Sequence, residues 1–488
     1  MRKIQIIGLL LLIILTACKE SVKNPQIQNE YPSLFPDYVE VTIPSNIAPL
    51  NFMLENDYDK IDVVISDRKG NTIHVQGEDY IDIPMKKWKN LLSDNVGQEI
   101  EFLVSAKVGD VWKQFQPFEI HISVEPIDYG IAYRRIAPSY DVYGKMGIYQ
   151  RDLSTFKERP IIENTFISGS CVNCHSFNQT KSDRMSLHIR GEYGGTLLSN
   201  GDSFDILNTK TDKTIGSCVY PYWHPSGKYI AYSTNQTHQI FHAGGTDKRI
   251  EVFDMESDVV VYDIENNVIL TSDLLSTKDF ETSPSFSPDG KTLYFACASQ
   301  TKMPAEYRDT RYNLCSIAFD PETGKFGNKC DTLVVADILG KSITFPKPSF
   351  DGRYIMYGWA DYGNFSIWHD EADLHLLDIK TGKTCALDGV NSNKAESYHN
   401  WSSNSRWFVV ASRRVDGLYS HPFIASIDEN GHTGKPFIVP QKDPRHYKTS
   451  FFSYNVPEFI SAPVSVNSNK VADSLLSSER KQVGFKKQ

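Results

Sequence analysis

The chain has 488 residues and a formal net charge of -9 at pH 7, from 60 Asp and Glu against 51 Lys and Arg. Because this length exceeds what one hydrophobic core usually supports, we expect two or more domains. The acidic balance excludes nucleic acid as an expected partner, since a protein that binds phosphates needs clustered Lys and Arg.

The first 17 residues have the pattern of a secretory signal peptide. Arg2 and Lys3 precede an apolar run over residues 4–15 that is too short for a membrane-spanning helix. Small residues then lead into Cys18, which resembles the site that lipoprotein signal peptidase cuts. We therefore predict that Cys18 is lipidated and that the protein contacts the membrane through this lipid anchor alone.

The residues after Cys18 indicate where the protein resides. Lys19 stands where an aspartate would retain a lipoprotein at the inner membrane. The pattern predicts an outer membrane lipoprotein that faces the periplasm or the cell surface; a plain secretory signal with an incidental cysteine is the alternative. Residues 18–31 are polar and lack periodicity, which is typical of a tether.

Residues 32–126 have the alternation of β-strands. Every second residue is apolar over 100–108, and again over 118–124, so these side chains share one face of a strand. Residues 67–71 are a turn signal, and residues 84–92 favour one short helix. We predict an N-terminal β-sandwich of the immunoglobulin or fibronectin type, without catalytic chemistry.

A pair of strands joined by a tight turn repeats within residues 128–462. Proline fixes the first position of the turn and glycine supplies its positive φ. Three clear copies and one looser copy occur at residues 222–232, 285–295, 349–357 and 401–410.

A strand that ends in Asp or Asn, followed by a polar turn, repeats independently of the first pattern. Six copies end at Asp152, Asn208, Asp263, Asp320, Asp378 and Asp428. Their spacing is nearly constant, about 50 to 58 residues, so each copy predicts one blade of a six-bladed β-propeller.

These residues resemble the TolB-like, WD40-like (PD40) propeller repeat, in which a Ser-Pro-Asp-Gly-Lys turn and a later Asp strand occur once per blade. The resemblance implies an architecture rather than an activity. The expected fold class is all-β, with a β-sandwich over 32–126 followed by the six-bladed propeller. Residues 130–133 and 450–453 are expected to complete one blade together, which would close the ring.

Cys171, Cys174 and His175 form a CxxCH sequence, the attachment signature of c-type haem. Two thiols at this spacing bond to the two vinyl groups of haem, and the adjacent histidine ligates the iron. The motif falls within a blade and no cytochrome-sized helical segment surrounds it. A haem c would therefore lie on a face of the propeller.

The sequence leaves the sixth iron ligand open, with Met185, His188 and His224 as candidates. Two alternatives to haem are also open for the motif: a Cys171–Cys174 disulfide in an oxidising compartment, or half of a zinc site.

Three histidines at blade-repeat positions, His224, His242 and His399, are candidates for a metal site in the central funnel. A structural histidine packed beside an aromatic residue is the alternative for each. Cys315 and Cys330 flank a turn and could bridge neighbouring strands, but cysteine pairing cannot be deduced from sequence.

No hydrolase elbow, zinc-protease helix, Walker loop or dinucleotide fingerprint occurs, so we assign no catalytic residue. Residues 463–488 are rich in Ser and Lys and are predicted to be a mobile polar tail.

Three functions remain. The first is an envelope-anchored binding or scaffold propeller that is not an enzyme and engages an envelope protein or a glycan. The second is a redox lipoprotein that carries haem c at residues 171–175, as in a family with this combination that is often labelled cytochrome c-related. The third is a metal-dependent polysaccharide lyase or hydrolase with its site in the funnel.

Overall fold

A computed structural model describes residues 20–137, 144–201, 203–242, 250–477 and 479–488. The predicted signal peptide and the lipidated Cys18 lie outside these ranges. Strands dominate the described residues, which confirms the all-β class. Their α-helices are α1 (Met85–Asp94), α2 (His446–Thr449) and α3 (Ser468–Leu476), and no helix among them is long and apolar enough to cross a membrane.

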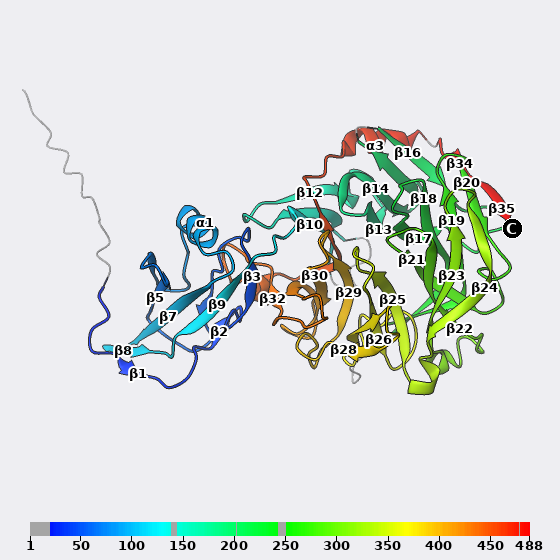
Figure 1. Ribbon diagram of the computed structural model, residues 1–488. Helices are drawn as coiled ribbons and strands as arrows, with labels where there is room; N and C mark the ends of the chain where they lie inside the picture. The colour runs from blue at the N-terminus through cyan, green and yellow to red at the C-terminus, as the bar shows by residue number, and fades with distance from the viewer. Residues whose placement is uncertain (1–19, 138–143, 202, 243–249, 478) are drawn as a thin grey trace, which may run out of the picture.

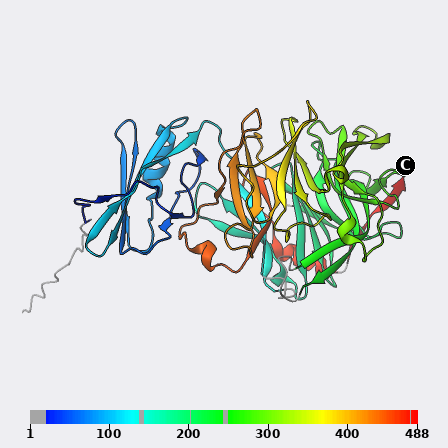
Figure 2. The ribbon, with the colours of Figure 1, turned by 90° about the horizontal axis from the view of Figure 1, so that it is seen from below.

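The N-terminal part lies beside a larger propeller-like ring of sheets (Figures 1 and 2). Its main sheet has seven strands, β1 (Gln26–Ile27), β3 (Thr42–Pro44), β5 (Lys60–Asp67), β6 (Thr72–Gly77), β7 (Glu99–Val108), β8 (Val111–Gln114) and β9 (Phe118–Ser123). The predicted turn joins β5 to β6, and the predicted helix is α1. Besides this sheet there is a two-stranded ribbon of β2 (Leu34–Phe35) and β4 (Met53–Leu54), so the sandwich stays a prediction.

The segment predicted to be a tether contacts this sheet from residue 20 onward. Strand β1 pairs in parallel with β8. The Glu20 carboxylate lies 3.1 Å from the Lys60 ammonium and 2.6 Å from the Lys107 ammonium. Polar composition alone suggested a free tether, but opposite charges on the sheet hold this part of it.

Four sheets of the ring are separate and mainly antiparallel. The first consists of β33 (Ser453–Ile460), β10 (Gly130–Ile136), β11 (Met146–Asp152) and β12 (Glu158–Glu163). The second consists of β13 (Cys171–Asn178), β14 (Lys181–Arg190), β15 (Gly195–Asn200) and β16 (Ser203–Asn208). The third consists of β25 (Ser342–Pro348), β26 (Tyr354–Ala360), β27 (Asp373–Asp378) and β28 (Thr384–Ala386), and the fourth of β29 (Glu396–Trp401), β30 (Trp407–Ser412), β31 (His421–Ser426) and β32 (Phe437–Ile438).

A fifth sheet of nine strands completes the ring. Its first half contains β17 (Cys218–Trp223), β18 (Tyr229–Phe241), β19 (Ile250–Asp263) and β20 (Val268–Thr271), and its second half contains β21 (Phe280–Phe286), β22 (Thr292–Ala298), β23 (Asn313–Asp320) and β24 (Lys325–Val334). One residue pair, Ser257 with Phe280, joins the halves. The ninth strand is the C-terminal β35 (Gly484–Lys487). Short 3-10 helices occur at Asn164–Phe166, Tyr307–Asp309 and Asp337–Leu339.

The chain closes its ring as predicted, by pairing an early strand with a late one. Strand β33 is antiparallel to β10, with Gly130 opposite Ile460 and Ile136 opposite Ser453. The late strand is Ser453–Ile460, so the expected segment 450–453 overlaps it at Ser453 alone and was placed too early in the chain.

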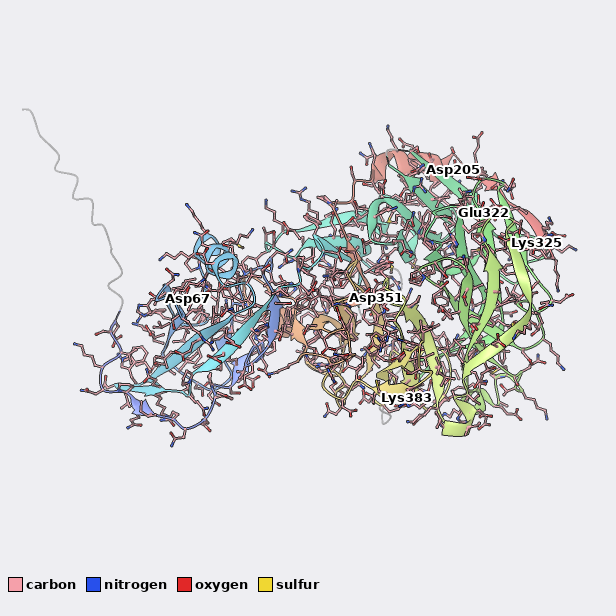
Figure 3. All side chains as sticks on the ribbon, viewed as in Figure 1. Asp67, Asp205, Glu322, Lys325, Asp351 and Lys383 are labelled. Carbon is pink, nitrogen blue, oxygen red and sulfur yellow. A yellow bond between two sulfur atoms is a disulfide. The ribbon has the colours of Figure 1, made fainter. Side chains whose placement is uncertain are left out.

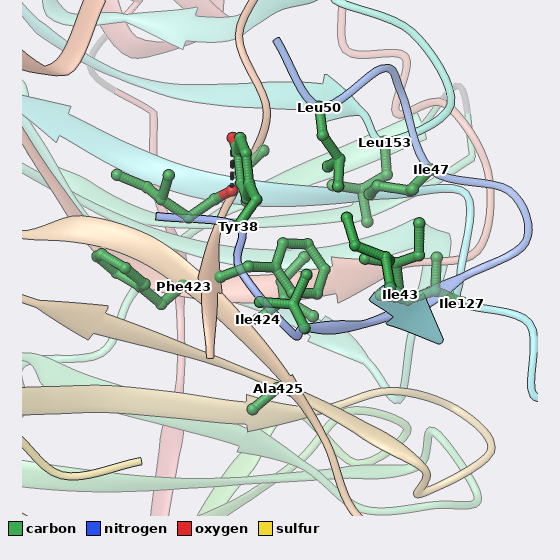
Figure 4. Packing of buried hydrophobic residues seen from close by; sticks show 14 of the residues in the cluster. Tyr38, Ile43, Ile47, Leu50, Ile127, Leu153, Phe423, Ile424 and Ala425 are labelled. Atoms are coloured by element: carbon green, nitrogen blue, oxygen red, sulfur yellow. Dashed lines mark hydrogen bonds between the residues drawn. The ribbon is translucent and has the colours of Figure 1, made fainter. Parts of the chain in front are cut away.

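The two parts of the molecule share one hydrophobic core, which Figure 4 shows at close range. Tyr38 from the N-terminal part is fully buried, and its hydroxyl donates a hydrogen bond to the Ile438 carbonyl at 3.4 Å. Phe423 and Ile424 of β31 belong to the same cluster. The N-terminal part is therefore packed against the ring rather than suspended beside it.

The described part of the predicted mobile tail, residues 463–477 and 479–488, is instead packed along the outer edge of the ring. Val471 and Leu475 of α3 are fully buried in the core of the β13–β16 sheet. Strand β34 (Lys481–Gln482) pairs in parallel with β16, and β35 pairs in parallel with β20. The Lys481 ammonium lies 3.0 Å from a carboxylate oxygen of Asp205, which Figure 3 labels. Two apolar residues four apart fix the helix, and the surrounding Ser and Lys obscured them in the sequence.

Candidate functional site

Six inner strands of the ring share an unusual backbone conformation. Strands β13, β17, β21, β25, β29 and β33 each contain a non-glycine residue with φ between 28° and 52°: Cys174, Tyr220, Ser283, Phe345, Tyr398 and Val456. Such a conformation costs about 1 to 3 kcal/mol per residue and persists only where the surrounding structure imposes it. All six residues line one cavity at the centre of the ring.

The residue that follows each of these positions also repeats. It is proline at four of them, Pro221, Pro284, Pro346 and Pro457, and histidine at the other two, His175 and His399. Proline suits a bulge because it cannot donate a ladder hydrogen bond. The Cys174-His175 half of the CxxCH motif therefore occupies a bulge that every inner strand has. In the strand that closes the ring, Val456-Pro457 occupies the position that Ser283-Pro284 has in β21.

The cavity has a volume of about 870 Å³, within the usual range of small-molecule sites. Aromatic rings form much of its wall, among them Tyr220, Phe345, Phe365, Trp368, Tyr398 and Tyr419. The rings of Phe345 and Tyr398 are 4.8 Å apart, so two neighbouring inner strands form a continuous aromatic surface. Such a wall favours a ligand with a flat, partly apolar body.

The charge of the cavity is opposite to that of the chain. Arg134, Arg190, Lys347 and Arg413 line it, whereas Glu458 is the one carboxylate among its described lining residues. No local pattern in the sequence singled out these residues, because they come from strands far apart in the chain.

Lys347 and Glu458 line both this cavity and a second, much smaller pocket that adjoins it. The Glu458 carboxylate accepts hydrogen bonds from the Ser176 hydroxyl at 3.3 Å and the Phe177 amide at 3.1 Å. Burial raises the pKa of Glu458 to about 7, and Lys347 opposes this rise. Burial lowers the pKa of Lys347, and Glu458 opposes that change.

All three functional residues of the CxxCH motif line this cavity. Cys171 and Cys174 are buried free thiols, so the alternative of a disulfide between them is not formed. The described residues contain a disulfide elsewhere, Cys297–Cys315 across β22 and β23, and Cys330 is free. The possible bridge between Cys315 and Cys330 is therefore not formed.

His175 is 2% exposed, and burial lowers its pKa to about 3, with Arg134 and Lys347 adding to the effect. The Ala132 carbonyl opposes this lowering. The ring is neutral at pH 7 as a result, which is the form that ligates a metal.

The structure does not bring the three candidate sixth ligands to this cavity. Met185 is fully buried in the core of its sheet. His188 has its Nδ1 3.5 Å from the Thr196 hydroxyl, and His224 has its Nε2 3.0 Å from the Gly290 carbonyl. Met146 does line the cavity, and sequence reasoning missed it.

The three proposed metal ligands are not gathered either. His242 and His399 line the cavity, but His224 packs against Phe286 with ring centres 4.8 Å apart. His399 donates from Nε2 to the Met356 carbonyl at 2.9 Å. Within the described ranges, no three residues of the metal-ligating types lie close enough to hold an ion. The structural alternative fits His224 because the fold buries it among aromatic rings.

No protein-family model and no curated protein matches this chain. Among solved structures, a puromycin-hydrolyzing peptidase from Mycobacterium tuberculosis is similar at 10% identity and a TM-score of 0.36, over 71% of this chain and 52% of that one. An ancestral GH74 enzyme has 11% identity and a TM-score of 0.35, over 64% and 47%. A prolyl endopeptidase has 9% identity and a TM-score of 0.33, over 64% and 42%. The chain spans about half the length of these proteins.

Proposed function

We propose that this protein is an envelope-anchored lipoprotein whose propeller binds a ligand in its central cavity. One observation carries the proposal: the residue of each inner strand that holds a left-handed conformation lines the same cavity of about 870 Å³. Strained backbone that is repeated around one space indicates selection for the shape of that space. The class of function is binding, with an envelope molecule or a glycan as the expected partner.

The proposal includes six blades. Four sheets are single blades, and the nine-stranded sheet counts as two because only the Ser257–Phe280 pair joins its halves. Each half also has its own inner strand with a left-handed residue, Tyr220 in one and Ser283 in the other.

Binding in the cavity can be tested by narrowing it. Thr237 and the adjacent Gln236 are both exposed, but Thr237 lines the cavity and Gln236 does not. We expect Thr237→Trp to lose the ligands that native mass spectrometry finds on protein purified from its own envelope, or that a glycan array detects. The control Gln236→Trp keeps them. Equal binding by both variants would place the ligand elsewhere.

Anchoring rests on Cys18 and has its own test. We expect Cys18→Ser to incorporate no labelled palmitate and to leave the membrane fraction, because the lipid is the proposed anchor. Membrane retention of this variant would contradict the proposal.

A second candidate function, a redox lipoprotein with haem c, has a specific observation in its favour. Cys171, Cys174 and His175 line one cavity, with both thiols free and the imidazole neutral. These residues fit covalent attachment and ligation from one side. When bound, haem supplies one-electron redox chemistry. The metal-dependent lyase has no comparable support, since its three histidines are not gathered.

The haem candidate is tested by a reduced-minus-oxidised visible spectrum and a denaturing haem stain, on protein made in a host with active cytochrome c maturation. We expect an α-band and a stain that Cys174→Ala abolishes and that Cys218→Ala, at a buried thiol outside the cavity, retains. A colourless protein with the mass of the unmodified chain would exclude haem.

A further inference from the structure

We propose that the ligand of the central cavity carries a carboxylate, which Arg134 and Arg190 bind from two neighbouring sheets. This inference rests on the proposed binding function and adds the chemical class of the ligand. It does not require that haem is attached to the CxxCH motif, because it follows from the charges around the cavity.

Arg134 has poor partners for a guanidinium. Its Nη2 lies 3.6 Å from the Met146 sulfur and 3.7 Å from the Cys171 sulfur. Its Nε is buried and has no acceptor among the described residues. Sulfur is a weak acceptor, and leaving a buried charged donor unsatisfied is costly. An anion in the cavity would supply the acceptor that Arg134 lacks.

Arg190 ends β14 directly beside this position. It is paired in register with Cys171, whose sulfur Arg134 contacts. It lines the cavity and forms no ion pair with any carboxylate in the described part of the chain. In an antiparallel pair the side chains of two residues in register lie on the same face of the sheet, so Arg190 shares the face of Cys171. Arg134 contacts the Cys171 sulfur from the neighbouring sheet, and the two arginines therefore line the same part of the wall.

Among the described residues, Glu458 is the one carboxylate that lines the cavity. Its carboxylate is held by hydrogen bonds from Ser176 and Phe177 and lies near Lys347, which offsets its charge. Two guanidinium groups without a carboxylate partner match a carboxylate ligand particularly well. Each planar guanidinium can donate two parallel hydrogen bonds to the two carboxylate oxygens.

The walls indicate what the carboxylate is attached to. Trp368 lies under the Arg413 guanidinium, 3.5 Å from its central carbon to the ring centre, and Phe345 and Tyr398 face the same space. The ligand is therefore a carboxylate on a flat, partly apolar ring system. A uronate sugar and a tetrapyrrole propionate share this chemistry, and the experiment separates these two sources.

The test measures binding of matched acid and neutral probes to the full mature chain by equilibrium dialysis. One pair is mesoporphyrin and its dimethyl ester, which has no free carboxylate. The other is a glucuronic-acid disaccharide and the corresponding neutral glucose disaccharide. We expect at least one acid to bind, and Arg134→Gln or Arg190→Gln to weaken it about 10- to 100-fold while changing its neutral counterpart less than about twofold.

Two further variants make the test specific. Arg68→Gln, at an exposed arginine of the N-terminal part, is the matched control and should bind like wild type. Arg134→Lys keeps the positive charge but loses the pair of parallel hydrogen bonds that a guanidinium donates. Its affinity for the acid probe should therefore lie between those of wild type and Arg134→Gln, and it replaces Arg134→Gln if that variant does not fold.

Binding of mesoporphyrin alone would identify a tetrapyrrole source, and binding of the uronate alone a sugar source. Equal affinity for acid and neutral probes, or arginine variants that bind like wild type, would overturn the carboxylate inference. If Thr237→Trp still blocked the probes in that case, the cavity would remain the binding site. Failure of every probe to bind wild type would overturn the inference and count against the cavity itself.

Discussion

Glu281 on β21 is a buried carboxylate with an incomplete set of partners. Its Oε1 accepts a hydrogen bond from the Thr277 hydroxyl at 2.6 Å, while its Oε2 is buried without a partner among the described residues. Burial raises its pKa to about 7, and hydrogen bonds from Thr277 oppose the rise. The protonated acid is therefore the form that the fold favours.

This burial predicts a pH dependence of stability. The contribution of Glu281 is fully present below pH 4.5, the ordinary pKa, and is lost as pH rises through about 7. We compare the free energy of unfolding of Glu281→Gln with that of wild type at pH 5 and at pH 8. We expect the difference, variant minus wild type, to be about 1 to 3 kcal/mol larger at pH 8. Denaturant unfolding at the two pH values measures the difference. Glu322→Gln, at an exposed carboxylate, is the control, and a pH-independent difference for Glu281→Gln would contradict the prediction.

At the scale of elements, the C-terminal segment acts as a brace on the outer edge of the ring. Helix α3 packs on the β13–β16 sheet, and β34 and β35 each extend an outer strand. Strands added in parallel cover edges that would otherwise be open to other chains.

Two adjacent leucines of α3 test this bracing role. Leu475 is fully buried, and Leu476 is 52% exposed. We expect Leu475→Ala to lower the free energy of unfolding by about 2 to 4 kcal/mol because it leaves a cavity, and Leu476→Ala to lower it by less than about 1 kcal/mol. Urea unfolding followed by circular dichroism measures both. If both variants lost less than about 1 kcal/mol of unfolding free energy, the C-terminal segment would not be packed against the ring.

At the scale of the molecule, the N-terminal part and the ring form one core through Tyr38 and its neighbours (Figure 4). Because a large apolar interface couples domains, we expect a single calorimetric unfolding transition for wild type. Tyr38→Ala should split it into two transitions, whereas Tyr31→Ala, at a side chain 39% exposed, should not. Two transitions already in wild type would contradict the coupling.

Local signals in the sequence were sufficient for the all-β class and for much of the strand pattern. The turn at 67–71, the helix that became α1 and the closure of the ring by an early and a late segment were predicted because each depends on residues close together or on a repeated pattern, although the late segment was placed too early in the chain. The same reasoning failed for 463–488, where Val471 and Leu475 carry the packing within a polar stretch.

The candidate site was accessible to sequence reasoning only at the CxxCH motif. Its other members, such as Arg134, Arg190, Lys347 and Glu458, have no local pattern that marks them. The repeated X-Pro pairs of the inner strands were a visible signal, but their meaning depends on the ring. The sequence by itself determined the class of fold and the chemistry of one motif, because neighbouring residues encode both. Only the tertiary structure decided which charges face the cavity, since residues more than 300 positions apart meet there, as Arg134 and Glu458 do.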